Sequence, residues 1–159
     1  MSINPDTTTV RRSVVVEAPI ELAFSFFTRD IGAWWDSDKH LLGEPLAEMI
    51  FEPHVGGHII DRGTNGAENR WGTVLVYEPP DRVTFSWDIN LSWQIETDPA
   101  RASEVHITFT AQDAKHTVVE LEHRHLDRHG NGWEAMRDAV GSPGGWDLQP
   151  YADALSEAA

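Results

Sequence analysis

Three histidines follow one another closely at the end of a run of alternating apolar residues. His123 and His125 are two positions apart, and His129 comes four positions later. Histidines at i and i+2 of a strand point to the same side of the sheet, where they could share a metal ion. No nearby carboxylate has a recognisable ligand spacing, and a hydrogen-bonded histidine at a cavity edge is the better interpretation of His123. We therefore predict neither a metal site nor a cofactor.

His123 is also the candidate general acid or base. An imidazole titrates near neutral pH, and burial can tune its pKa further. Neither a nucleophile nor an oxyanion donor can be assigned beside it, and the local patterns of Ser-His-Asp chemistry are absent from the sequence. The sequence therefore leaves open whether the chain is an enzyme.

Other groups that carry chemistry in many proteins have simpler interpretations here. Asp61 is followed by Arg62 near a predicted strand end, and an exposed ion pair is favoured over a carboxylate at a cavity mouth. Gly56-Gly57 and the segment 63–66 suit hairpin turns and lack the strand-to-helix context of a phosphate-binding loop. Nucleotide binding is not predicted.

Tryptophan is the main compositional clue. The 159 residues include seven tryptophans, which must be placed in a core, an interface or a cavity. Large rings pack poorly without gaps, and a gap lined by Trp, Phe and Met with one or two polar groups is the usual form of a small-molecule pocket. A ligand-accessible cavity is therefore expected, with a filled core as the alternative.

Composition excludes several classes of partner. The formal net charge of -14 would repel a phosphate backbone, so nucleic acid and anionic membranes are not predicted partners. The absence of cysteine excludes disulfides and thiolate chemistry. No apolar run approaches the roughly 20 residues that span a bilayer. Nothing at the N-terminus resembles a signal peptide, so a cytoplasmic location is expected.

Length and local patterns predict one domain at 8–159 after a flexible tail at 1–7. A first strand ends at Ala18-Pro19, and a short helix to Thr28 and a second one within 30–36 follow. Period-2 patterns then predict strands at 47–52, 58–62, 70–78, 82–89, 104–111 and 117–124.

Helical spacing returns over 131–159. The segment 141–145 contains three glycines and a proline, so we expect it to divide this helix by a bend. The segment 90–103, before the last two strands, is interpreted as a long connection.

Alternation within the strands predicts how the sheet is covered. Val83, Phe85 and Trp87 share one face of their strand, whereas Thr84 and Ser86 share the other. One sheet face is therefore expected to be apolar and the other wetted, with the C-terminal helix packed across the apolar face. This order of elements predicts the α+β class.

Several motifs, taken in order, are similar to those of a known family. They are APIELAF at 18–24, FTRDIGAWW at 27–35, FEPHVGG at 51–57, WGTV at 71–74, EPPDRV at 78–83 and SPGGW at 142–146. Over nearly its whole length the chain resembles the SRPBCC or START-like (Bet v 1-like) superfamily, and within it the proteins related to the activator of Hsp90 ATPase. The resemblance implies a helix-grip fold, in which a curved antiparallel sheet wraps around a long C-terminal helix, with two short helices after the first strand. It also implies a cavity between sheet and helix.

The expected ligand contacts combine this scaffold with the aromatic residues. We expect Trp34, Trp35 and the loop up to Pro45 to form a mobile lid. The residues predicted to contact the ligand are Trp34, Trp35, Trp71, Phe85, Trp87, Phe109, Leu121, His123, Trp133, Met136 and Trp146.

Three functions compete on this scaffold. The first is binding or handling of a small hydrophobic molecule, which is aromatic, polyketide-like or lipid-like. The second is a cyclase or dehydratase that uses the same cavity, with His123 as acid or base. The third is a co-chaperone of the Hsp90 type or another protein-interaction module; the short tail in place of the activator's N-terminal domain weighs against it. A homodimer is a further expectation, because exposed tryptophans are expected and soluble proteins often form two-fold pairs.

Overall fold

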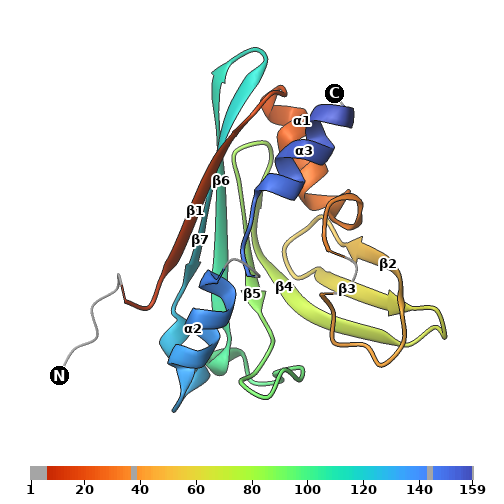
Figure 1. Cartoon of the computed structure of the whole chain (residues 1–159), viewed down its shortest axis with the longest axis vertical. Coiled ribbons are helices and arrows are strands. Elements are labelled where there is room, and N and C mark those ends of the chain that lie inside the picture. Colours follow the sequence, from red (N-terminus) through yellow and green to blue (C-terminus); the bar gives the residue numbers. More distant parts are fainter. Residues whose placement is uncertain (1–6, 37–38, 143–144, 159) are drawn as a thin grey trace.

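The computed structural model of the chain describes residues 7–36, 39–142 and 145–158. Within them, seven antiparallel strands form one curved sheet in the order β1-β7-β6-β5-β4-β3-β2 (Figure 1). The strands are β1 (Val10–Val16), β2 (Leu46–Phe51), β3 (His58–Gly63), β4 (Glu68–Glu78), β5 (Arg82–Trp87), β6 (Ser103–Asp113) and β7 (His116–Arg124). The helices are α1 (Ile20–Thr28), α2 (Trp133–Gly141) and α3 (Gln149–Ala158), with 3-10 turns η1 (Ile31–Ala33), η2 (Pro99–Arg101) and η3 (Leu126–His129). Of the predicted tail, residues 1–6 lie outside the described residues.

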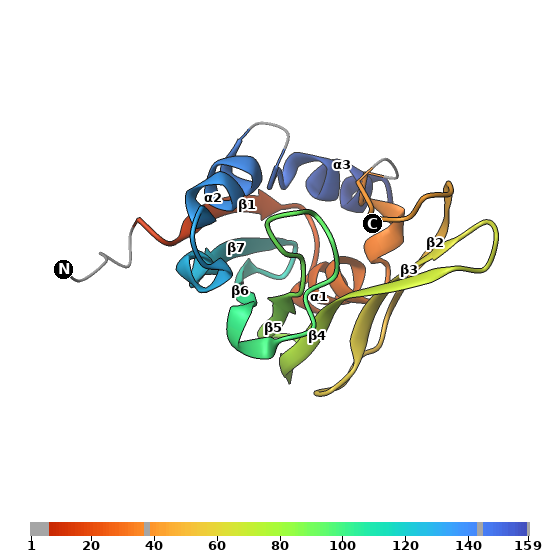
Figure 2. The ribbon, with the colours of Figure 1, turned by 90° about the horizontal axis from the view of Figure 1, so that it is seen from below.

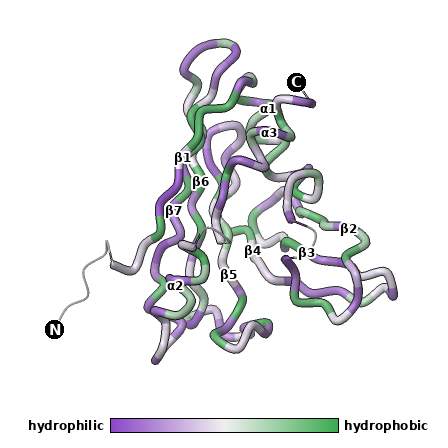
Figure 3. Tube along the Cα trace, in the orientation of Figure 1, coloured by the Kyte–Doolittle hydropathy of each residue, from purple (hydrophilic) through white to green (hydrophobic). Residues whose placement is uncertain are grey.

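The central strands carry the alternation that the sequence predicts. On β6 and β7, Ile107 pairs with Leu121 and Phe109 pairs with Val119, and all four side chains are buried on one face. Figure 3 shows that the tip of this hairpin is hydrophilic. The register therefore turns the apolar residues of both strands toward the helices.

The expectation of a wetted outer face is wrong for β5. Thr84 and Ser86 are buried together with the apolar residues of the other face. Ser86 accepts a hydrogen bond from the Thr73 amide, and the Thr84 hydroxyl lies 3.2 Å from Nδ1 of His106. Neighbouring polar side chains thus cover the outer face of this central strand.

The C-terminal cover consists of two separate helices, as the predicted bend requires. α2 ends at Gly141, and α3 starts at Gln149. Figures 1 and 2 show α3 beside α1 at one end of the sheet and α2 toward the other end.

The α+β class and the helix-grip arrangement are confirmed. The second short helix after β1 is the single 3-10 turn η1. None of the described helices is long and apolar enough to cross a membrane.

An irregularity between β3 and β4 shapes the concave face. The ladder passes from the pair Ile59 and Gly72 to the pair Ile60 and Arg70, so Trp71 has no partner on β3. Such a bulge re-aims side chains locally. On β3, Ile59, Ile60 and Asp61 are all buried, although simple alternation would expose one of them.

The contact between α3 and α1 includes one buried hydrogen bond that mutation can test. The Tyr151 hydroxyl donates to the Ala23 carbonyl at 2.6 Å. We expect Tyr151→Phe to lower the free energy of unfolding by about 1 kcal/mol, measured by urea denaturation, because the carbonyl loses its side-chain donor. Tyr77→Phe is the matched control, since the half-buried Tyr77 hydroxyl has no hydrogen-bond partner among the described residues. Equal losses in the two variants would contradict this assignment.

Candidate functional site

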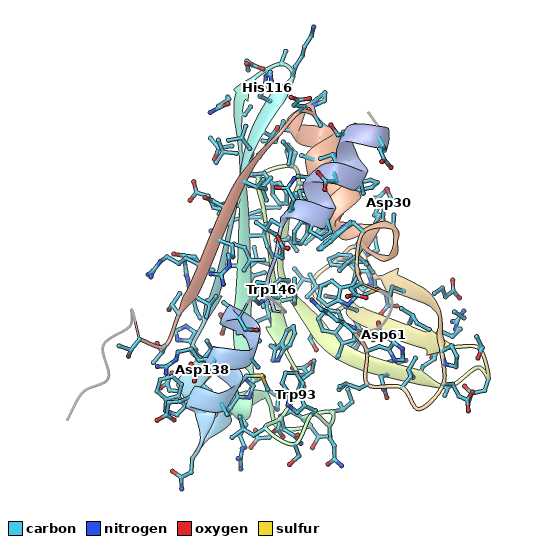
Figure 4. The ribbon with its side chains drawn as sticks, viewed as in Figure 1. Asp30, Asp61, Trp93, His116, Asp138 and Trp146 are labelled. Atoms are coloured by element: carbon cyan, nitrogen blue, oxygen red, sulfur yellow. The ribbon has the colours of Figure 1, made fainter. Side chains whose placement is uncertain are left out.

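A pocket of about 590 Å³ opens between the sheet, the loop after η1 and the connection from α2 to α3. Figure 4 shows Trp146 in the middle of the molecule, with Asp61 on the β3 side and Trp93 at the far end of the sheet. The residues that line the pocket are Trp34, Trp35, Asp36, Lys39, His40, Leu41, Asp61, Trp71, Trp87, Ile89, Trp93, Ala139, Val140, Gly145, Trp146, Asp147 and Pro150. Six of them are tryptophans, so indole surface dominates the wall.

Four indoles of the wall form a closed ring, which we call the tryptophan ring: Trp35, Trp71, Trp87 and Trp146. The ring centroids are 5.2 Å apart for Trp35 and Trp71, and 5.6 Å apart for Trp71 and Trp87. Trp146 closes the ring at 5.7 Å from both Trp87 and Trp35. These tilted and edge-on contacts are favourable arrangements for aromatic rings.

Hydrogen bonds from the indole nitrogens fix the orientation of most of these rings. Trp35 donates to the Lys39 carbonyl at 2.9 Å, and Trp34, which packs against Trp35, donates to the Phe26 carbonyl at 3.2 Å. Trp87 differs, because its indole nitrogen is buried without a partner among the described residues. The walls are thus mostly preformed, as ligand pockets usually are.

Asp61 belongs to the pocket, which corrects the expectation of an exposed ion pair. Its side chain is 2% exposed and accepts a hydrogen bond from the Trp71 indole at 3.0 Å. The exposed ion pairs are made by the next residue, as Arg62 contacts Glu48 and Glu68 on the outer side. Burial raises the pKa of Asp61, against the lowering effect of the Trp71 hydrogen bond.

His123 lies behind the pocket wall, outside the pocket lining. It is fully buried and shares the face of Leu121, as the alternation predicts. Its Nδ1 accepts a hydrogen bond from the Trp146 indole at 3.0 Å, and its Nε2 lies 2.7 Å from the Ser103 hydroxyl. Burial, assisted by His129, lowers the pKa of His123 to about 3. This geometry makes His123 a neutral residue that holds Trp146 in place.

The histidines do not form the metal pair considered from the sequence. His125 is exposed and has a left-handed φ of 60°, which ends the strand before it. His129 instead approaches His123 through the Ser103 hydroxyl, 2.7 Å from its Nε2. All these contacts are satisfied when Trp146 donates to Nδ1 of His123, Nε2 of His123 donates to the Ser103 hydroxyl, and this hydroxyl donates to Nε2 of His129. Among the described residues, no group of three or more potential ligands could hold a metal ion.

The structure brings together five of the predicted contact residues: Trp34, Trp35, Trp71, Trp87 and Trp146. The others lie outside the pocket lining. Phe85, Leu121 and Met136 are core residues, and Phe109 packs edge-on against Phe24 and Phe27. Trp133 is half-buried on α2, with the Arg137 guanidinium 5.2 Å from its ring centroid.

Two lining residues have features that sequence reasoning missed. Trp93 was assigned to a connection, and it stands 47% exposed at the pocket edge with a left-handed φ of 57°. For Trp93 the sequence contains one signal, which is a tryptophan among polar neighbours. Asp61 had no such signal, because its burial depends on contacts with other strands, such as the hydrogen bond from Trp71 on β4.

The predicted lid is only partly described. Trp34 is 8% exposed and packs against Tyr151 at 5.3 Å, so it is part of the fixed wall. Lys39, His40 and Leu41 line the pocket from the following loop, whereas residues 37–38 lie outside the described residues. Ligand-dependent motion of this loop stays a prediction.

The burial of His123 predicts a specific pH dependence of stability. The pKa of His123 is about 3 in the folded chain, below the ordinary value of 6.5. Between these two pH values the unfolded chain binds a proton on this residue and the folded chain does not. We expect the free energy of unfolding to decrease as the pH falls from about 6.5 toward 3. This decrease should be shallower in His123→Asn, measured by urea denaturation across that range. The exposed variant His125→Asn is the control, and identical slopes for wild type and His123→Asn would refute the assignment.

Comparisons with known proteins agree with this architecture. The family model of activator of Hsp90 ATPase homolog 1-like proteins matches residues 17–150. A solved anthrahydroquino-γ-pyrone synthase, Txn09, is 37% identical, with 92% of this chain and 96% of that chain covered and a TM-score of 0.67. The self-sacrificing resistance protein CalC from Micromonospora echinospora is 28% identical, with 96% of both chains covered and a TM-score of 0.63.

A more distant likeness shows the fold alone. The HSP90 activator PFC0360w from Plasmodium falciparum is 18% identical, with 83% of this chain and 86% of that chain covered and a TM-score of 0.53. The curated proteins gave no significant match. The family model spans most of the sequence, and the synthase covers more than two thirds of it above 30% identity. The chain belongs to the family of activator of Hsp90 ATPase homolog 1-like proteins.

Proposed function

We propose that this protein binds a planar, polycyclic aromatic molecule of the polyketide type in the tryptophan-lined pocket. The observation that carries the proposal is the tryptophan ring, whose four indoles line a pocket of about 590 Å³. A volume of this size lies within the usual range for small-molecule sites, roughly 300–1,000 Å³. Flat indole faces offer large apolar contact areas at little entropic cost, and they suit a flat ligand.

The comparisons support an oxygenated aromatic ligand. The synthase at 37% identity is named for an anthrahydroquino-γ-pyrone, which is a fused aromatic system carrying oxygen atoms. Polar groups of this pocket, such as the buried Asp61 and the half-buried His40, stand where a ligand's hydroxyl or carbonyl groups would need partners. A purely lipid-like ligand would leave Oδ2 of Asp61 without a hydrogen-bond partner, which costs free energy.

An enzyme on the same pocket is the second candidate, and one observation favours it. Asp61 is a buried carboxyl whose pKa is raised by desolvation, the condition under which a carboxyl can take up and return a proton. Asp61 therefore replaces His123 as the acid-base candidate of a cyclase or dehydratase.

The test is to offer the chain the substrate of the γ-pyrone synthase and to follow product formation by mass spectrometry. Turnover that is lost in Asp61→Asn would support an enzyme, and absence of turnover would leave binding alone.

A co-chaperone role has less support. Docking to another protein would require a contiguous exposed apolar patch. Only four large apolar residues are exposed among those described: Val15, Val55, Leu75 and Trp93. Only Trp93 of these lines the pocket.

The proposed binding mode predicts unequal effects for two tryptophan substitutions. Trp35 contacts Trp34, Trp71 and Trp146, whereas Trp133 lies outside the pocket lining. We expect Trp35→Ala to weaken binding of a hydroxylated anthraquinone by about ten- to a hundredfold, because stacking on one aromatic side chain contributes about 1–3 kcal/mol. Trp133→Ala should change the affinity less than about twofold.

The measurement is quenching of tryptophan fluorescence during titration, checked by calorimetry because each substitution removes a fluorophore. Both variants are first compared with wild type by circular dichroism to establish that they are folded. Equal losses of affinity in the two variants, or no binding to the wild type, would contradict the proposed site.

A further inference from the structure

The pocket contains one buried carboxylate with an open side toward the cavity. We propose that Asp61 recognises a protonated amine on the aromatic ligand, so that the natural ligand is an amine-bearing polycyclic aromatic molecule. This inference rests on the proposed binding function and specifies its ligand class. The arguments are the bonding of Asp61, the indoles around it and the charges at the rim.

Within the described residues, only one of the two carboxyl oxygens of Asp61 has a hydrogen-bond partner. One oxygen, Oδ1, accepts the hydrogen bond from Trp71 at 3.0 Å, and Oδ2 has no hydrogen-bond partner among the described residues. Asp61 is also in no ion pair within that part of the chain, although it is 2% exposed. Among the described residues, the only fully buried side-chain nitrogen or oxygen atoms without a hydrogen-bond partner are Trp87 Nε1 and His129 Nδ1. Oδ2 of Asp61 is unpartnered but does not belong to this group, so it is accessible. The free oxygen therefore faces the cavity, where a ligand can reach it.

An unpaired carboxylate in such a place is costly without a cation. Burial disfavours the charged form, which is why the pKa of Asp61 is raised. A hydroxyl group on a ligand offers Oδ2 one hydrogen bond but no opposite charge. A protonated amine supplies both the hydrogen bond and the opposite charge, and hydrogen bonds between charged groups are the stronger kind.

The indoles beside Asp61 favour the same ligand chemistry. Trp71 is bonded directly to the carboxyl, and Trp35 and Trp87 contact the Trp71 ring. The faces of tryptophan rings attract cations, and aromatic enclosures of this type are used to bind ammonium groups. The carboxylate and the indole faces thus both attract a cation.

The charges at the pocket rim add to this preference. Asp36 and Asp147 are exposed at the rim, so the lining holds three carboxylates with Asp61. The opposing groups are the exposed Lys39, whose ammonium lies 3.4 Å from the Gly145 carbonyl, and His40, whose Nδ1 accepts the Leu42 amide. The charge of a protonated His40 lowers the pKa of Asp61, but this effect is smaller than the raising effect of burial. The whole chain has a net charge of -14, which also attracts cations to its surface.

The test uses two anthraquinone probes that differ in one group. One carries a propylamine arm, which is protonated at about pH 7, and the other carries an isosteric propanol arm. We expect wild type to bind the amine at least about tenfold tighter than the alcohol, measured by calorimetry at physiological ionic strength. Asp61→Asn keeps an oxygen for the Trp71 hydrogen bond but removes the charge, so the preference for the amine should fall to within about twofold.

Asp127→Asn is the matched control, since it removes an exposed carboxylate outside the pocket lining and changes the net charge equally. It should retain the preference for the amine, whereas a general attraction of cations to an acidic protein would be reduced similarly by both substitutions. Should Asp61→Asn fail to fold, the carbon-13 shift of the Asp61 carboxyl in wild type replaces it, and only the amine should move this signal.

The outcomes separate the two proposals. Equal affinity of wild type for the two probes overturns the amine inference and leaves the aromatic binding function standing. An amine preference that survives in Asp61→Asn also overturns the role of Asp61. Failure of both probes to bind overturns the binding function and the inference together.

Discussion

The turn after α2 is the constraint on which the pocket depends. At Gly145 the chain passes so close to the end of the helix that a Cβ would lie 2.2 Å from the Val140 carbonyl oxygen, so a side chain has no room there. The same oxygen accepts the Trp146 amide at 2.7 Å, and the turn thus aims the Trp146 indole at the sheet.

The interior behind Trp146 holds it by polar bonds in an apolar setting. His123 receives the indole hydrogen bond and stays neutral, because full burial lowers its pKa to about 3. The polar chain through Ser103 to His129 is buried as well, which makes it costly to break and gives Trp146 a defined orientation. Asp61 and Trp71 form the opposite wall in the same way. Rigid walls reduce the ordering cost of binding, which suits a pocket for a flat, rigid ligand.

The sequence predicts features of this protein that depend on local patterns, and it fails where distant segments meet. The strands, the division of the C-terminal helix and the burial of His123 follow from periodicity and from the glycine-rich turn. The burial of Asp61 does not follow, because a charged side chain favours an exposed position and its partner, the Trp71 indole, comes from a different strand. The position of His123 behind the pocket also depends on Trp146, which fills the space in front of it from a segment 23 residues away. Motif resemblance supplied the family, whereas pocket membership required the three-dimensional structure.

The central claim is that the tryptophan ring is a ligand site rather than a filled core. Its most direct test is a nuclear magnetic resonance titration of the indole N–H signals with the neutral propanol-substituted anthraquinone. The account predicts that the signals of Trp35, Trp71, Trp87 and Trp146 shift together at saturation while Trp133 stays unchanged. Unmoved ring signals, or a shift confined to Trp133, would contradict it.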